Sequence, residues 1–209
     1  MLQNDPPSRS RLFSAARRLF AENGYESTST SSIARAAGTS ESQLIKHFGG
    51  KAGLLESIFI DGWEKLRPWF DEKLRTELSP VERLRAIPRL MVEALENDPD
   101  LRLLLLLEGR RVRREGGQAN FTDGFTGIAT LLDQTLADMK DSGELRDVVS
   151  PQSVRAALIG LTEGAMRDQL LSERAGHPAE FRVENIGSLT DAVVETVRNR
   201  HGQGLAGSL

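Results

Sequence analysis

The sequence predicts an all-α protein of about nine helices. Apolar residues recur along most of the chain at the three- and four-residue spacing of amphipathic helices, and no segment alternates convincingly like a strand. Three pairs, Ser79-Pro80, Asp98-Pro99 and Ser150-Pro151, put a capping side chain before a proline whose missing N–H costs nothing at a first helical position. These pairs mark three helix starts.

The first helix is expected from about Ser10 to Asn23. Its apolar residues fall at helical spacing, and Gly24 stands where a left-handed C-terminal cap is expected. Downstream, Ser29 or Thr30 can cap a short helix that ends at Gly38. Ser40 can cap the next helix, from Glu41 to Phe48.

The spacing around Gly38 is that of a helix-turn-helix. Ala34 lies four residues before the glycine and Leu44 six after it, so a small residue, a turn and an apolar anchor follow one another. If Leu44 and Phe48 face the core, the rest of the second helix is exposed. A helix of this kind fits the DNA major groove, where Gln can pair with adenine and an apolar side chain can meet a thymine methyl. The alternative is a polar face in contact with water.

The later helices are less sharply defined. Apolar stripes are expected at Phe59 to Phe70, Phe121 to Met139 and Ile186 to Val197, and Pro68 and Pro88 should end or kink their helices. The apolar run Leu103 to Leu107 is expected to be buried on all sides.

Composition excludes several function classes. The 209 residues contain no cysteine and three histidines, far apart in sequence, so disulfides, thiol catalysis and a metal centre are not expected. No nucleophile motif or phosphate-binding glycine loop is present, so we expect neither an enzyme nor a cofactor. No signal peptide and no run of roughly 20 apolar residues is found, so we expect a cytoplasmic protein without membrane contact.

Charge is unevenly distributed. Residues 1–56 contain seven Lys/Arg and five Asp/Glu, a net +2, which leaves −5 for the remainder of a chain whose total is −3. A mildly basic head on an acidic body suits local contact with an anion such as DNA.

The segment "RLFSAARRLFAENGYESTSTSSIARAAGTSESQLIKHFGGKAGLLESIF" resembles the TetR family of bacterial transcriptional repressors over about residues 9–60. The shared features include Asn-Gly-Tyr after the first helix, the Ala-Gly turn, Leu-x-x-His-Phe and Lys-x-x-Leu-Leu. The resemblance implies a helix-turn-helix DNA-binding domain over residues 1–52. A larger helical effector-binding and dimerisation domain is expected over 53–201, and a disordered tail over 202–209.

The resemblance also implies the DNA contacts. In similar proteins the segment Ser40 to His47 is the recognition helix, Ser29 to Ser31 opens the supporting helix, and Lys51 contacts a phosphate. The implied contact residues are Ser29, Thr30, Ser31, Ser40, Glu41, Ser42, Gln43, Ile45, Lys46, His47 and Lys51. This chain departs from the family pattern at Ile45, where tyrosine is usual, at Ser42, often glycine, and at Ser32, usually acidic.

A regulator of this type needs a dimer surface. Ala156, Gly160 and Gly164 line up on one helix face, and glycines inside a helix suggest close approach by another helix, either from a second copy or from the same chain. With the stripe on the last helix, the expected dimer residues are Ala156, Gly160, Gly164, Leu189, Val193 and Val197.

The expected ligand pocket is formed by Phe59, Trp63, Leu104, Glu108 and Phe125. The predicted function is a sequence-specific DNA-binding regulator, a homodimeric repressor that an unknown small-molecule effector releases from a palindromic operator on double-stranded DNA. The alternative is a helical protein that binds a small molecule or a partner and whose DNA-binding head has degenerated.

Overall fold

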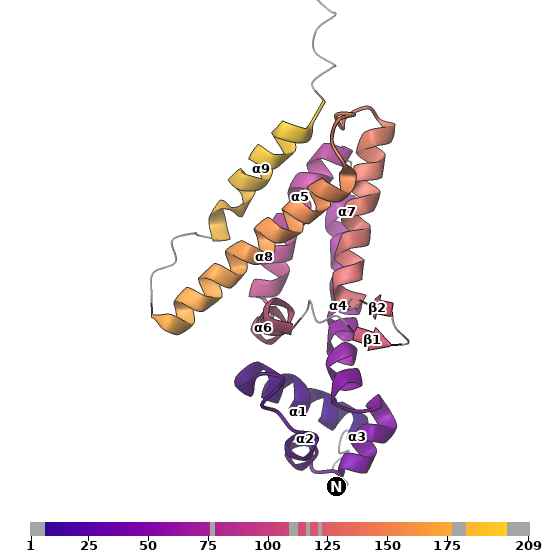
Figure 1. Cartoon of the computed structure of the whole chain (residues 1–209), viewed down its shortest axis with the longest axis vertical. Coiled ribbons are helices and arrows are strands. Elements are labelled where there is room, and N and C mark those ends of the chain that lie inside the picture. The colour runs from indigo at the N-terminus through magenta and orange to yellow at the C-terminus, as the bar shows by residue number, and fades with distance from the viewer. Residues whose placement is uncertain are drawn as a thin grey trace, which may run out of the picture. The chain divides into compact units, whose positions relative to one another are not determined.

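A computed structural model describes residues 7–75, 78–108, 113–115, 118–120, 123–176 and 183–199 of the chain. These residues form nine α-helices, which confirms the all-α prediction, together with one short hairpin and one 3₁₀ turn (Figure 1). The helices are α1 Ser8–Asn23, α2 Thr30–Ala36, α3 Glu41–Phe48, α4 Lys51–Arg75, α5 Pro80–Glu96, α6 Pro99–Glu108, α7 Asp123–Asp141, α8 Pro151–Ala175 and α9 Ile186–Val197. The hairpin pairs β1 (Arg113–Glu115) with β2 (Gln118–Asn120), and the 3₁₀ turn is Val183–Asn185.

Two compact units divide the chain. The first comprises residues 1–65 and 98–126, and the second residues 66–97 and 127–209. Helix α4 therefore contributes its N-terminal part to the first unit and its C-terminal part to the second. The sequence-based boundary after residue 52 stays a prediction.

The first unit is built around α1, which packs against α2, α3 and α6. Leu12, Ala16 and Phe20 of α1 are almost completely buried, as their spacing predicts. The helix begins at Ser8, two residues before the expected start, with Pro7 at its N-cap. Figure 1 shows α1, α2 and α3 grouped beside the start of α4.

Two glycines allow close packing in this unit. A Cβ atom on Gly53 would lie 1.8 Å from the Phe48 carbonyl oxygen, and one on Gly62 would lie 2.8 Å from a methyl carbon of Leu101. Glycine at position 53 lets the first turn of α4 pack against the end of α3. Glycine at position 62 lets α6 approach α4 closely. On α6, Leu107 is 48% exposed, so the expected burial of the whole run Leu103 to Leu107 is wrong at its end.

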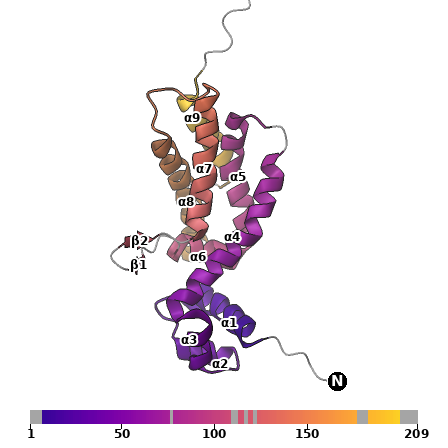
Figure 2. The same cartoon turned by 90° about the vertical axis from the view of Figure 1, so that its right-hand side faces the viewer.

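The second unit contains a group of three mutually packed helices, α5, α8 and α9 (Figure 2). Three ion pairs join α5 to α9. In two of them, Arg85 Nε lies 3.4 Å from Asp191 Oδ1 and Arg89 Nη2 lies 2.9 Å from Asp191 Oδ2. Arg85 also pairs with Glu195. The register of α9 against α5 is therefore fixed by charge as well as by apolar burial.

Helix α5 begins with the predicted capping box. The Ser79 hydroxyl oxygen accepts from the Glu82 N–H at 3.3 Å, and Glu82 accepts from the Ser79 N–H at 2.8 Å. Hydrogen bonds from the Ser79 backbone N–H and then from its hydroxyl lower the pKa of the Glu82 carboxyl.

Neither interior proline ends its helix. Pro68 lies inside α4 and Pro88 inside α5, so of the two expected effects, a helix end or a kink, the helix end does not occur and the kink stays a prediction. A proline removes one backbone hydrogen bond, and packing of the surrounding turns can offset that loss. Phe70 and Ile87, each 1% exposed, supply such packing beside the two prolines. Within the described residues, no helix is long and apolar enough to cross a membrane.

Candidate nucleic-acid interface

The turn between α2 and α3 adopts the predicted conformation. Gly38 has φ +60°, in the left-handed region that favours glycine, and the Thr39 N–H donates to the Ala34 carbonyl at 3.0 Å. Helix α2 therefore ends at the turn, and α3 can start two residues after Thr39.

The start of α3 is capped as predicted. The Ser40 side-chain oxygen accepts from the Gln43 backbone N–H at 3.4 Å. On the core side of α3, Leu44 is 0% and Phe48 8% exposed. The remaining side chains face outward or lie at the edges of the helix. The outward face of α3 is therefore polar, with Ile45 as its one apolar residue.

The exposure of this surface matches the sequence-based expectation. Ile45 is 59% exposed, although buried apolar residues precede and follow it in the chain. Gln43 and His47 are half-buried at the edges of the helix. The exposed polar members are Ser40, Glu41, Ser42 and Lys46.

Several outward-facing groups are held by neighbours. The Thr30 hydroxyl donates to Glu41 Oε2 at 2.6 Å, which joins the first turn of α2 to the first turn of α3. At the other end of α3, His47 Nε2 lies 3.0 Å from Ser8 Oγ. These bonds restrict side-chain rotamers, so part of the surface is preorganised before any DNA contact.

The predicted contacts on α2 have mixed roles. Ser29 caps α2 by accepting from the Ser32 N–H at 3.1 Å, and its hydroxyl lies 3.0 Å from that of Ser31. Both serines are exposed, and because one hydroxyl hydrogen serves the contact between them, the other remains available to donate to a phosphate oxygen.

Lys51 has a structural role that the sequence did not reveal. Its Nζ donates to the Tyr25 carbonyl at 2.9 Å and the Thr28 carbonyl at 3.0 Å, and it lies 4.2 Å from the Tyr25 ring centroid. Two of its three N–H groups are thus directed at the loop before α2, which leaves one for the phosphate contact that the family resemblance implies.

Sequence reasoning also missed Arg11. Its guanidinium Nε donates to the Ala37 carbonyl at 2.9 Å, and Nη2 lies 3.5 Å from the Gly38 carbonyl oxygen. A cation at the C-terminal end of α2 is favoured by the helix dipole as well as by these bonds. Because these partners lie 26 and 27 residues away in sequence, no local spacing could have indicated the contact.

The expected ligand-pocket residues are incompletely described. Phe59 of α4 and Leu104 of α6 are each 1% exposed, and Trp63 is half-buried. The side chains of Glu108 and Phe125 lie outside the described residues. Two cavities among the described residues, one lined by α1, α4 and Asp100 and one lined by α5 and the Glu184–Asp191 segment, include none of these five, so their role as ligand contacts stays a prediction.

Five of the six expected dimer residues lie toward the outside of the second unit. Ala156, Gly160 and Gly164 of α8 are exposed, Leu189 is 36% exposed and Val193 is half-buried. Val197 is 9% exposed because α9 turns a different stripe inward, formed by Ile186, Thr190, Val194 and Val197.

Comparison with known proteins also identifies the N-terminal residues as a regulator's DNA-binding domain. Residues 12–58 match the model described as bacterial regulatory proteins, tetR family. The chain is 25% identical over 168 residues to the fatty acid metabolism regulator protein of Bacillus subtilis (strain 168), covering 78% of this chain and 86% of the relative. It is also 25% identical over 167 residues to the HTH-type transcriptional regulator UidR of Escherichia coli (strain K12), covering 78% and 81%.

The fold is shared with solved regulators. The structure of FadR from Bacillus subtilis in complex with stearoyl-CoA superposes with a TM-score of 0.71 at 22% identity, covering 89% of this chain and 95% of the other. These relatives are regulators and not enzymes, which confirms the sequence-based expectation that this chain is not an enzyme. The chain is therefore a DNA-binding transcriptional regulator whose helix-turn-helix domain is that of the tetR family of bacterial regulatory proteins.

Proposed function

We propose that the chain acts as a homodimeric repressor that binds a palindromic operator through two copies of α3. The observation that supports this most directly is the outward face of α3, where Gln43, Ile45 and Lys46 lie beside a buried Leu44. Gln43 can pair with adenine, Ile45 can meet a thymine methyl, and Lys46 can approach a phosphate. One such helix reads only a few base pairs, so specificity requires a second copy.

The surface of α8 supports a dimer. Each glycine in a helix interior costs about 1 kcal/mol relative to alanine, so two on one face need a reason. Cβ atoms built on Gly160 and Gly164 meet no described atom within 4 Å, so packing within the described chain does not require glycine there. Close approach by α8 of a second copy explains both residues, with Leu189 and Val193 of α9 extending the interface.

Analytical ultracentrifugation tests this surface with a matched pair of substitutions. Ala156→Leu should shift the chain from dimer toward monomer because the larger side chain blocks close helix approach. Ala137→Leu makes the same change at an exposed position of α7 and should leave the dimer intact. Equal dimer stability in both variants would place the interface elsewhere.

The proposed effector is an apolar-tailed small molecule, and a long-chain acyl-CoA is the first to test. The support is the likeness to FadR of Bacillus subtilis, which was solved with stearoyl-CoA. The effector would favour the conformation in which the two recognition helices are wrongly spaced and so shift the population away from DNA. The contacts proposed for it remain Phe59, Trp63, Leu104, Glu108 and Phe125.

Selection of duplexes from a random pool tests the operator. The expected product contains two inverted half-sites whose centres lie about 34 to 36 Å, one helical turn, apart or a multiple of this. Stearoyl-CoA should then release the selected duplex in a fluorescence anisotropy titration. Enrichment of no sequence would support a degenerate head, and single half-sites would contradict the dimeric reading. Release by no acyl-CoA would exclude that effector class alone.

A further inference from the structure

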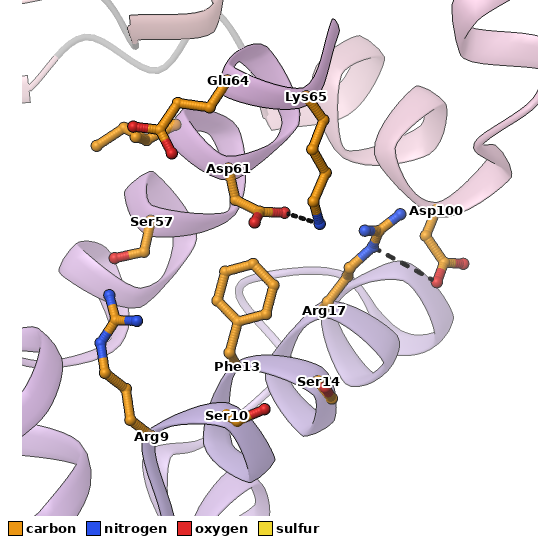
Figure 3. Close-up of a pocket in the computed structure, with 11 residues that line it drawn as sticks. Arg9, Ser10, Phe13, Ser14, Arg17, Ser57, Asp61, Glu64, Lys65 and Asp100 are labelled. Carbon is orange, nitrogen blue, oxygen red and sulfur yellow. Dashed lines mark hydrogen bonds and ion pairs between the residues drawn. The ribbon is translucent and has the colours of Figure 1, made fainter. Parts of the chain in front are cut away.

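The first unit contains a groove whose lining includes none of the predicted DNA-contact residues. Its volume is about 740 Å³, within the range of small-molecule sites. One face of α1 and one face of α4 form its walls, and Asp100 at the start of α6 contributes to its rim (Figure 3). None of the ligand-pocket residues expected from the sequence lines it.

Polar and charged side chains make up most of the groove lining, and two apolar residues lie among them. Phe13 of α1 and Ile60 of α4 are its two apolar lining residues, and both are half-buried. Figure 3 shows the Phe13 ring between the side chains of the two helices. These two side chains can contact the apolar part of a ligand, while the surrounding charges select its polar groups.

Four of the rim charges are already paired. Lys65 Nζ lies 2.7 Å from Asp61 Oδ2, and Arg17 Nε lies 4.0 Å from Asp100 Oδ2. Arg17 also pairs with Asp98. These groups neutralise one another and define one side of the groove.

Arg9 and Glu64 differ from the other rim charges. Neither forms an ion pair with any residue that the structure describes, and both side chains are exposed. They come from opposite walls, and in Figure 3 Ser57 lies between them. The groove therefore has one cation and one anion that lack an ion-pair partner among the described residues, and both line it together with Phe13 and Ile60.

We propose that this groove binds a dipolar small molecule, with an anionic group on Arg9, a cationic group on Glu64 and an apolar or aromatic body on Phe13 and Ile60. A guanidinium can hold a carboxylate through two parallel N–H···O bonds, which gives the anionic end its orientation. A ligand with only one charge leaves the opposite rim charge unpaired. The site goes beyond the proposed operator and effector functions and does not depend on either.

Arg9 also connects the groove to the recognition helix. Its guanidinium carbon lies 5.2 Å from the ring centroid of Phe48, the last residue of α3. A cation at this distance attracts the face of the ring. A ligand anion that draws Arg9 toward the groove changes its contact with Phe48. Ligand binding in the groove therefore alters the surroundings of the C-terminal end of α3.

Titration of the isotope-labelled full chain with dipeptides tests the proposal. The probe is lysyl-phenylalanine, which carries ammonium groups, an aromatic ring and a carboxylate. Its amide lacks the carboxylate, and acetyl-leucyl-phenylalanine lacks the ammonium groups. We expect saturable chemical-shift changes at Phe13, Ile60 and Phe48 with lysyl-phenylalanine, and affinities about fivefold weaker for each of the two control peptides.

Matched variants assign the charges. Arg9→Gln and Glu64→Gln should each weaken lysyl-phenylalanine binding about fivefold. Arg18→Gln and Glu22→Gln make the same changes at exposed positions of α1 outside the groove and should leave binding unchanged. Arg9→Gln should also remove the discrimination between the dipeptide and its amide.

Three results would overturn the proposal. The first is the absence of saturable shifts at Phe13 and Ile60 up to about 10 mM probe. The second is binding that neither groove variant weakens. The third is equal affinity for all three peptides, which would show apolar adsorption without charge selection. Binding at the groove with no change at Phe48 would overturn the connection to α3.

Discussion

Ile45 gives the sharpest prediction because it is the apolar residue in the centre of an exposed polar helix face. Complete burial of an isoleucine side chain contributes about 1.5 to 3 kcal/mol. Since 59% of Ile45 is exposed, DNA can bury at most that share, which corresponds to about 1 to 2 kcal/mol. Ile45→Ala should therefore weaken operator binding by roughly 5- to 30-fold.

The assay compares operators that differ in one methyl group. Replacing a single thymine by uracil removes the C5-methyl and leaves base pairing intact, so each operator position can be tested by anisotropy titration. At the contacted thymine, the loss caused by Ile45→Ala should disappear once uracil is present, because the two changes remove the same contact. Val148→Ala, at a side chain that is 83% exposed in a loop, controls for removal of surface apolar area.

The refuting result is specific. If Ile45→Ala weakens binding equally on the thymine and uracil duplexes at every position, Ile45 contacts no methyl group. If the substitution has no effect on any duplex, the outer face of α3 does not read the operator at this residue.

Three further predictions concern the charged and capping residues. Lys51→Met should lower the free energy of unfolding by about 1 to 2 kcal/mol in denaturant titration, because two backbone carbonyls lose a charged donor. Lys46→Met should leave stability unchanged and reduce the salt slope of DNA binding by about 1. A similar stability loss is expected for Arg11→Met, and Arg11→Lys should recover part of it. Ser79→Ala should cost about 1 kcal/mol near neutral pH. Because hydrogen bonding lowers the pKa of Glu82, its contribution is present above the usual carboxyl pKa and is lost as pH falls through the lowered one, so the difference from wild type should shrink on acidification. Unchanged melting temperatures for Lys51→Met and Arg11→Met, or a pH-independent Ser79→Ala effect, would contradict these assignments.

The sequence predicts local features of the head well because capping and turn chemistry act over a few residues. Ser40, Gly38 and the pair Leu44 and Phe48 define the start, the preceding turn and the inward face of α3 without reference to the rest of the chain. The capping box at Ser79 is predictable for the same reason.

Contacts between distant segments were not predictable. Arg11 donates to a carbonyl 26 residues away, and nothing in the spacing of basic residues distinguishes it from its exposed neighbour Arg9. Lys51 was assigned to DNA by resemblance, and only coordinates show that its ammonium also holds the loop before α2.

The phase of a helix is also difficult to assign from apolar residues alone when its buried stripe includes polar residues. On α9, Thr190 is 0% exposed while Leu189 is 36% exposed, so a stripe chosen by apolarity mixes the inner and outer faces. An interior proline does not by itself locate a helix end, because Pro88 is buried in a helix that continues for two more turns.

The central claim is that α3 reads a specific DNA sequence in a dimer. It is tested most directly by titrating the purified chain into the selected operator and into a scrambled duplex of equal composition at the same salt concentration. The account predicts two chains per operator and an affinity at least about 10³-fold higher than for the scrambled duplex. Equal affinity for the two duplexes would contradict it.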